Sequence, residues 1–172
     1  MKIKFLTVAL VTLGVANVSM AAETITFIGT IESNTCAVNV GGTASPTVTL
    51  PTVGTGDLTV SGDTAGATPF TVNLTGCSAT ADDVSVRFAA HNPNGTNLGV
   101  NAASTAGNVA VQLLNGSAGG NPIVFTGGIG ISAQTTTSGG AASVPLTAQY
   151  YATGATTAGS VTAVADYEVI YP

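Results

Sequence analysis

Few side chains in this sequence have types and spacings that suit catalysis or metal binding. His91 is the only histidine, and its sequence neighbours are Ala90, Asn92 and Pro93. A metal site would need carboxylates around it, so the sequence predicts a solvent-facing loop histidine. A Ser-His-Asp triad stays open on composition alone, but no serine lies in the Gly-x-Ser-x-Gly turn that would support one.

Two further motifs resemble parts of active sites. Asp82 and Asp83 could be paired acids for glycoside chemistry, but adjacent residues at the start of a strand point to opposite faces, which favours a solvated turn. Gly127-Gly128-Ile129-Gly130 lacks the lysine and the helix that follow a phosphate-binding loop, so a turn within a sheet is expected. The sequence therefore predicts no enzyme, and no catalytic, cofactor-binding or metal-binding residue.

The N-terminus has the parts of a secretory signal peptide. Lys2 and Lys4 form a short positive region, an almost wholly apolar run follows, and Ser19-Met20-Ala21 supplies small residues where signal peptidase reads them. The apolar run is too short for a comfortable membrane span. We therefore expect residues 1–21 to be removed and the exported, soluble protein to begin at Ala22, with Glu23 as the alternative first residue.

Cys36 and Cys77 are the only cysteines. In an exported protein an even count predicts a disulfide, which would contribute roughly 4 kcal/mol on the chain-entropy estimate. The alternative is a pair of free reactive thiols. Neither cysteine has a Cys-x-x-Cys partner or an adjacent basic residue that would activate it, so the disulfide is preferred.

The charge balance after removal of the signal peptide excludes one class of partner. Of three Lys and Arg residues only Arg87 remains, against eight Asp and Glu residues. One cationic side chain cannot neutralise a row of phosphates, so nucleic acid is excluded. Anionic membrane surfaces are disfavoured for the same reason.

Alternating apolar and polar residues recur along the mature chain, which is typical of strands with one buried face. Hydrophobic residues make up 45% of the sequence, glycine occurs 22 times, and no window has the spacing of a long amphipathic helix. The expected strands are 24–32, 36–40, 47–51, 70–74, 84–88, 109–113, 144–150 and 161–171, with shorter ones at 123–125 and 130–131. The sequence predicts a single all-β domain, most simply a two-sheet sandwich.

The first of these strands allows two interpretations. Ile25, Phe27, Gly29 and Ile31 share one face of the stretch 24–32. On these residues alone, an ordinary first strand of the chain's own sandwich is preferred. The alternative is an arm that completes the sheet of a different subunit.

The expected last strand makes that alternative specific. Tyr167, Val169 and Tyr171 lie on one face of it, Asp166 and Glu168 lie on the other, and the strand runs to within a residue of the C-terminus. Nothing remains beyond it to pair with it. An exposed apolar edge is a liability that natural proteins cover.

Taken in order, seven stretches resemble the chaperone–usher pilins of the type 1 fimbrial family. They are Thr-Ile-Thr-Phe-Ile-Gly-Thr-Ile at 24–31, Asn-Thr-Cys-Ala-Val at 34–38, Phe-Thr-Val-Asn-Leu-Thr-Gly-Cys at 70–77, Asn-Val-Ala-Val-Gln-Leu-Leu at 108–114, Val-Pro-Leu-Thr-Ala-Gln-Tyr-Tyr at 144–151, Ala-Gly-Ser-Val at 158–161 and Ala-Asp-Tyr-Glu-Val-Ile-Tyr at 165–171. The resemblance implies an incomplete immunoglobulin-like β-sandwich of six strands. It lacks its last strand and is completed by a donor strand from another subunit. The domains would be a signal peptide (1–21), a donor-strand extension (22–33) and a pilin domain (34–172).

The resemblance also implies partners and roles for individual residues. The partners would be identical or related pilin subunits, a periplasmic chaperone and an outer-membrane usher, and the subunit would pass through the periplasm into a surface fimbria used in adhesion. The implied roles are inserting residues Ile25, Phe27, Gly29 and Ile31, acceptor-groove residues Tyr167, Val169 and Tyr171, and a chaperone-binding carboxylate on Pro172.

Two alternatives remain beside a shaft subunit. The arm is short for a major pilin, and Glu23 stands where a further apolar anchor would be expected. A minor, adaptor or tip subunit with a receptor-binding role is therefore the second hypothesis. A self-contained secreted sandwich, including an enzyme, is the third.

Overall fold

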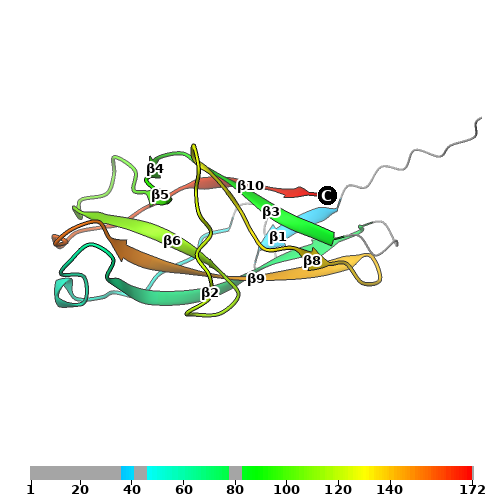
Figure 1. Ribbon diagram of the computed structural model, residues 1–172, viewed down its shortest axis with the longest axis horizontal. Helices are drawn as coiled ribbons and strands as arrows, with labels where there is room; N and C mark the ends of the chain where they lie inside the picture. Colours follow the sequence, from blue (N-terminus) through cyan, green and yellow to red (C-terminus); the bar gives the residue numbers. More distant parts are fainter. Residues whose placement is uncertain (1–35, 41–45, 78–82, 172) are drawn as a thin grey trace, which may run out of the picture. The chain divides into compact units, whose positions relative to one another are not determined.

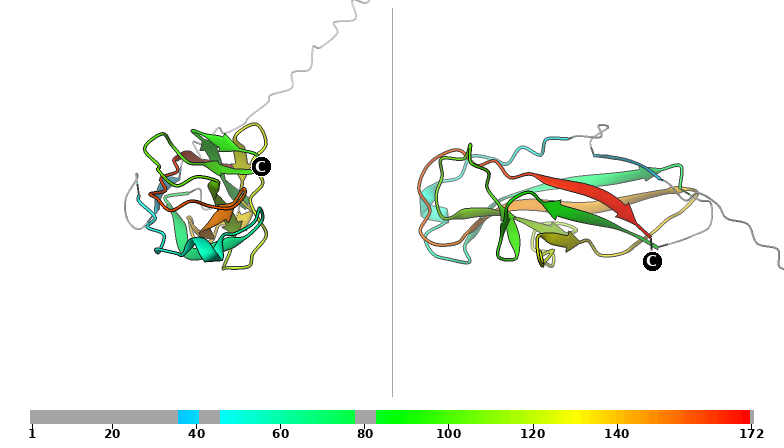
Figure 2. Two further views of the ribbon diagram at one scale, coloured as in Figure 1. Left: turned by 90° about the vertical axis from the view of Figure 1, so that its left-hand side faces the viewer. Right: turned by 90° about the horizontal axis from the view of Figure 1, so that it is seen from above.

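The computed structural model describes residues 36–40, 46–77 and 83–171, which all fall in one compact unit. The expected signal peptide, the arm at 22–33 and Pro172 lie outside the described residues. Within them, ten strands form two sheets that face each other across a shared core (Figures 1 and 2). No helix in this part of the chain is long and apolar enough to cross a membrane.

The larger sheet is antiparallel, and its strand order is β1-β2-β9-β6-β5-β4. Its strands are β1 (Ala37–Val40), β2 (Thr64–Thr75), β4 (Pro93–Asn94), β5 (Asn97–Gly99), β6 (Val109–Asn115) and β9 (Ala141–Ala152). The smaller sheet has the order β10-β3-β7, with β8 also paired to β3. Its strands are β3 (Asp83–Ala90), β7 (Ile129–Ile131), β8 (Thr135–Thr136) and β10 (Ala165–Ile170). A short 3-10 helix, Thr55–Asp57, precedes β2.

The core lies between the sheets and follows the period-2 pattern of the sequence. Its fully buried members include Val72 and Leu74 on β2, Val84 and Val86 on β3, and Leu146 on β9. Because side chains alternate between the two faces of a strand, the polar residues between them lie on the opposite face, where some, such as Ser85 and Thr147, are buried as well. The predicted inward faces of β2, β3, β6 and β9 are therefore confirmed.

Two predicted turns are also confirmed. Gly116 follows β6 with φ 75°, and the chain turns at Asn115-Gly116, as the Asn-Gly dipeptide after the strand at 109–113 predicts. Gly127 and Gly128 have φ of 58° and 83°, and they connect the bridged pair Thr126 and Ile129. A two-residue turn with two positive φ angles favours glycine because a Cβ atom would be strained there.

Four expectations about the strands are wrong in detail. Residues 47–51 form no strand, since Pro46 and Pro51 interrupt the backbone ladder at both ends. Residues 123–125 form none either, because their backbone bonds cross to Leu113 and Thr96, while Ile123 and Phe125 are buried. The last strand begins at Ala165 rather than near residue 161, and the β4–β5 hairpin is absent from the expected strands.

The disulfide between Cys36 and Cys77 is present, as predicted. It joins the residue before β1 to a residue just past the end of β2, next to the first paired residues of the two strands, Ala37 and Thr75. Because β1 has only four residues, this covalent link fixes the start of a short strand at the margin of the larger sheet.

Candidate functional site: an open edge between two strands

The two sheets each end in a strand with one unpaired side. In the described part of the chain, β1 is bonded to β2 alone and β10 to β3 alone. The hydrogen bond between Cys36 and Tyr171 shows that β1 and the end of β10 approach each other. The sheet order therefore leaves an opening between β1 and β10 that no other described strand fills.

Apolar side chains along β10 face this opening and are only half-buried. Val161, Ala163, Ala165, Tyr167, Val169 and Tyr171 pack against the core as one row, whereas the residues between them, such as Thr162, Asp166 and Glu168, are exposed. On neighbouring β3, the inward residues Val84 and Val86 are 0% exposed. β3 and β10 carry the same alternating pattern, but the inward side chains of β10 are less buried. The core is therefore incompletely covered along β10.

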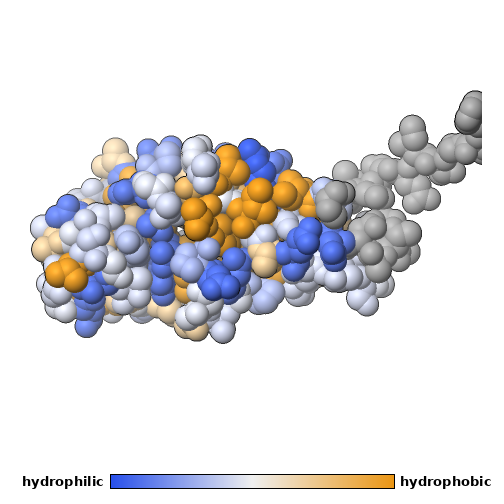
Figure 3. All heavy atoms as spheres, viewed as in Figure 1, coloured by the Kyte–Doolittle hydropathy of each residue, from blue (hydrophilic) through white to orange (hydrophobic). Residues whose placement is uncertain are grey.

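The opposite wall of the opening has the same character. Val38 on β1, together with Val48 and Leu50 in the segment that follows, packs against the core but stays half-buried. We call the space between this wall and residues 161–171 the open groove. Figure 3 shows hydrophobic side chains gathered over the region where β10 and β3 run in Figure 1.

Two hollows border this wall and the far end of the groove. One, of about 350 Å³, has Val40, Val48 and Phe70 among its lining residues. The other, of about 520 Å³, is lined by apolar residues that include Leu58, Val109, Tyr150 and Val161. Since Val161 begins the half-buried row, the larger hollow continues the groove beyond the start of β10.

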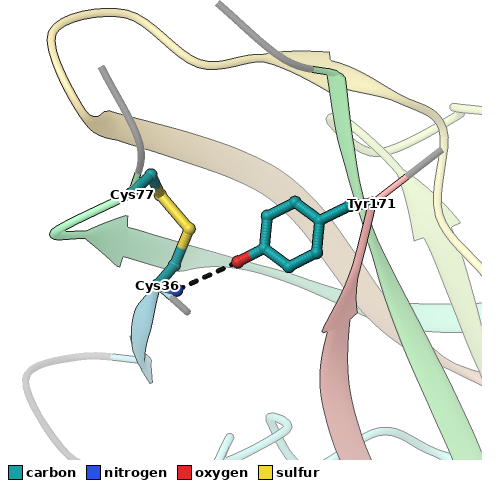
Figure 4. Close-up of a disulfide and its surroundings, with 3 residues drawn as sticks. All are labelled: Cys36, Cys77 and Tyr171. Atoms are coloured by element: carbon teal, nitrogen blue, oxygen red, sulfur yellow. Dashed lines mark hydrogen bonds between the residues drawn. A yellow bond between two sulfur atoms is a disulfide. The ribbon is translucent and has the colours of Figure 1, made fainter. Parts of the chain in front are cut away.

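At its other end the groove is crossed by one side chain. Tyr171 reaches from the end of β10 toward the disulfide, and the backbone N–H of Cys36 donates a hydrogen bond to its hydroxyl oxygen at 2.9 Å (Figure 4). The ring of Tyr171 and both cysteines pack against the core cluster. This bond is the contact by which the two walls meet.

The outer face of β10 carries charges rather than apolar residues. Glu168 stands directly opposite Arg87 in the ladder and forms an ion pair with it. His91 Nε2 lies 3.0 Å from Asp166 Oδ2. Charged side chains on an edge strand oppose unwanted pairing with other chains.

His91 is exposed in the bend after β3, as predicted, but a carboxylate that its sequence neighbours do not indicate lies beside it. The carboxylate beside it comes from Asp166, which is 75 residues away and is brought close by the pairing of Ala165 with Ala90. No group of three or more metal-ligating side chains occurs in the described ranges, so the pair has the character of a surface contact.

Sequence reasoning missed one polar turn next to the larger hollow. Asp63 Oδ2 accepts hydrogen bonds from the backbone N–H groups of Thr59 and Val60 and from the Thr59 hydroxyl. These bonds, that of Val60 first, lower the pKa of Asp63 below its usual value. An aspartate three or four residues after candidate N–H donors, followed by β2, was the available signal.

The predicted acceptor residues thus come together. Tyr167, Val169 and Tyr171 lie in the half-buried row that faces the open groove. The fourth, Pro172, and the predicted donor residues Ile25, Phe27, Gly29 and Ile31 lie outside the described residues, so their roles remain predictions.

An all-β sandwich of this topology, with an incompletely covered row beside the last strand, defines an immunoglobulin-like pilin domain. A family model described as "Fimbrial protein" matches residues 25–172, and the chain belongs to this family. It is 35% identical to the S-fimbrial protein subunit SfaA of Escherichia coli O6:K15:H31 over 99% of both chains. It is 39% identical to the major fimbrial subunit SMF-1 of Stenotrophomonas maltophilia, over 88% of this chain and 93% of that one.

The fold comparison agrees. A subunit chain from the structure of a chaperone–usher pilus that addressed rod uncoiling superposes with a TM-score of 0.61 at 20% identity, covering 92% of this chain and 100% of that chain. At this identity the match supports the fold alone. Together with the family match, it makes the protein a fimbrial structural subunit.

Proposed function

We propose that this subunit polymerises by donor-strand exchange, in which the open groove accepts residues 22–33 of another subunit. The observation that carries the proposal is the half-buried apolar row at 161–171, which lies between the edges of two strands, β1 and β10, that no described strand joins. Addition of an extended segment to an exposed sheet edge is an established mode of recognition, and donor-strand complementation of pilins is one of its known forms. Backbone bonds supply affinity, and side chains in pockets supply specificity.

Residues 22–33 would supply the apolar side chains needed to cover the half-buried row of the groove. Burial of Ile25, Phe27 and Ile31 against the half-buried row would contribute roughly 5–9 kcal/mol, before any backbone hydrogen bond. Gly29 fits where the groove is too shallow for a Cβ atom. The polar residues of the arm, on the other face, would remain in solvent.

The direction of the inserted strand follows from the fold. The inserted strand would run opposite to β10, as most neighbouring strands of an immunoglobulin-like sandwich do, and it would then run parallel to β1, whose start lies beside the end of β10. Ile31 would then lie near Val161 and the hollow of about 520 Å³, while Ile25 would lie toward Tyr171. Inserting residues on the arm and inward residues on β10 both recur every second residue, about 6.8 Å apart, so the two rows can match along their length.

Assembly needs the groove to be covered before it meets the next subunit. An exposed apolar edge invites unwanted pairing. A periplasmic chaperone that lends a strand, followed by an outer-membrane usher that allows exchange, would meet this need, with the Pro172 carboxylate as the group held by chaperone cations. Residues 1–21 would direct the chain to the periplasm, and the finished fimbria would stand on the cell surface.

Adjacent substitutions in the arm test the proposal. Phe27→Asp places a charge on the inserting face, and Thr26→Asp places the same charge on the outer face. Each full-length variant is expressed in the periplasm with a fimbrial chaperone, and unboiled samples are run on gels. We expect heat-labile ladders from the unaltered chain and from Thr26→Asp, and monomers from Phe27→Asp. Equal ladders from both variants would contradict insertion of this face.

Deletion of residues 22–32 tests the arm as a whole. The truncated subunit should remain chaperone-bound and soluble, because its groove is intact, but it should not polymerise. Fimbriae made of truncated subunits would overturn the proposal. An unaltered chain that stays a soluble monomer without a chaperone and forms no heat-labile ladders would favour a self-contained secreted protein.

A second candidate function is that of an adaptor or tip subunit. The short arm and Glu23 in place of an apolar anchor favour it. Immunogold labelling separates the two functions, since a shaft subunit is labelled along the whole filament and a tip subunit only at its end.

A further inference from the structure

One end of the open groove is occupied by Tyr171, a side chain of the same subunit that forms the groove. Its ring packs against the core cluster, and its hydroxyl accepts a hydrogen bond of 2.9 Å from the backbone N–H of Cys36. Cys36 is held in turn by its disulfide to Cys77 (Figure 4). The tyrosine is therefore anchored at its backbone on the β10 side and at its hydroxyl on the β1 side.

This bond has a consequence for any strand that enters the groove. An inserted strand extends the sheet by bonding to backbone groups on the edges of β1 and β10. The N–H of Cys36, which points toward the β10 side, is already used by Tyr171. A ladder along β1 therefore has no donor at Cys36 while the bond is kept, and the end of the groove is fixed at this residue.

The arm has a matching irregularity. Counted by twos from Ile31, its positions are Ile31, Gly29, Phe27, Ile25 and Glu23, so the face that is otherwise apolar or glycine ends in a carboxylate. In the antiparallel arrangement with Ile31 near Val161, this last position lies opposite Val169, the inward residue next to Tyr171. A buried, unpaired carboxylate there would be costly, whereas a position already filled by an aromatic ring needs no apolar side chain from the arm.

We propose that Tyr171 is a positioning residue that fills the last position of its own groove and sets where the donor strand stops. It thereby selects an arm with only four inserting residues. The inference rests on the proposed donor-strand exchange. The inference adds that the last position of the groove is filled by the accepting subunit and not by the donor strand.

A double-mutant cycle in the full-length chain tests this assignment. The variants are Glu23→Leu, Tyr171→Ala and the two combined, with mass spectrometry to confirm removal of the signal peptide. The measurement is the rate at which assembled fimbriae dissociate to monomers in detergent at a fixed raised temperature. Tyr151→Phe, on β9 away from the groove, is the control for loss of a tyrosine hydroxyl.

We expect Glu23→Leu to change the dissociation rate of otherwise unaltered fimbriae by less than about twofold, because the ring already fills the position. In the Tyr171→Ala background the leucine enters the vacated space and slows dissociation by about tenfold or more, as burial of a leucine side chain allows. Equal slowing in both backgrounds would show that the position is open in the unaltered subunit and would overturn the inference.

Tyr171→Phe keeps the test decisive if Tyr171→Ala does not fold. This variant retains the ring and loses the bond to Cys36, so Glu23→Leu in this background should again change the dissociation rate by less than about twofold. Slowing by about tenfold in this background would show that the ring does not fill the position and would overturn the inference. Failure of the unaltered chain to form fimbriae would instead overturn donor-strand exchange itself, so the two failures are distinguishable.

Discussion

Strands β9 and β10 carry the same alternating pattern but differ in how well it is buried. On β9, which lies between β2 and β6, Val144, Leu146 and Ala148 are 2%, 1% and 4% exposed. On β10, which has β3 as its one bonded neighbour among the described strands, Tyr167 and Val169 are half-buried. The difference teaches that pattern decides which face turns inward, whereas the neighbouring strands decide whether that face is covered.

The largest expected effect concerns the covalent link at the margin of the groove. Replacing Cys36 and Cys77 by serine should lower the free energy of unfolding of the monomer by about 4 kcal/mol, because the unfolded chain loses a constraint. Denaturant titration measures the change. The unaltered protein with reduced and blocked thiols is the control, and it should lose a similar amount. An unchanged midpoint would show that the β1 side of the groove does not depend on the link.

The comparison of β9 with β10 is tested directly by two truncations. Leu146→Ala should cost the monomer roughly 3 kcal/mol, since it leaves a cavity in the closed core. Val169→Ala should cost the monomer about 1 kcal/mol or less, because much of its side chain is uncovered there. In assembled fimbriae Val169→Ala should have the larger effect and should markedly speed the dissociation of subunits from one another. Equal costs in the monomer would mean that the row on β10 is already covered.

Lowering the pH should loosen the turn between Thr59 and Asp63 and leave β9 unaffected. The pKa of Asp63 is lowered by its bonds from Val60 and Thr59, so its contribution is present above the ordinary value of 3.8 and is lost as the pH falls through the lower folded value. The amide NMR signals of Thr59 and Val60 should move with a midpoint below 3.8. In Asp63→Asn they should not titrate in this window. A midpoint at or above 3.8 in the unaltered protein would contradict the assignment.

The smallest expected effect is on the outer face of β10. Arg87→Gln removes the partner of Glu168, and both side chains are more than a third exposed. Solvent screens such pairs, so the monomer should lose at most about 1 kcal/mol, and less at high salt. Glu168→Gln is the matched variant and should give the same small change. A loss comparable to that of Leu146→Ala would show that charges, rather than burial, hold β10 in place.

Much of the fold follows from the sequence because its pattern is local. The inward faces of β2, β3, β6 and β9 could be read from alternation, and the turns at Asn115-Gly116 and Gly127-Gly128 from residues that tolerate positive φ. Residues 47–51 misled because their burial alternates although no backbone ladder forms. A period of two in the sequence shows which side chains face the core, and it does not show whether the backbone is hydrogen-bonded to a neighbouring strand.

For three candidate acceptor residues, the sequence predicts the shared face and not the geometry around it. Tyr167, Val169 and Tyr171 could be placed on one face, but their half-buried state depends on which strands lie beside β10. The contact of Tyr171 with Cys36 joins residues 135 apart, and the pairing of His91 with Asp166 depends on the register of β10 with β3. Neither contact can be predicted from the residues that neighbour its members in the sequence.

The disulfide has a mechanical consequence for a fibre joined as proposed. Tension on such a fibre reaches each subunit through the residues that precede Cys36, and β1 has only four residues with which to resist being peeled from its sheet. The bond to Cys77 passes the load into the twelve-residue β2, which lies between β1 and β9. A pulled filament would therefore strain its noncovalent joints between subunits before it could unravel a subunit from its first strand.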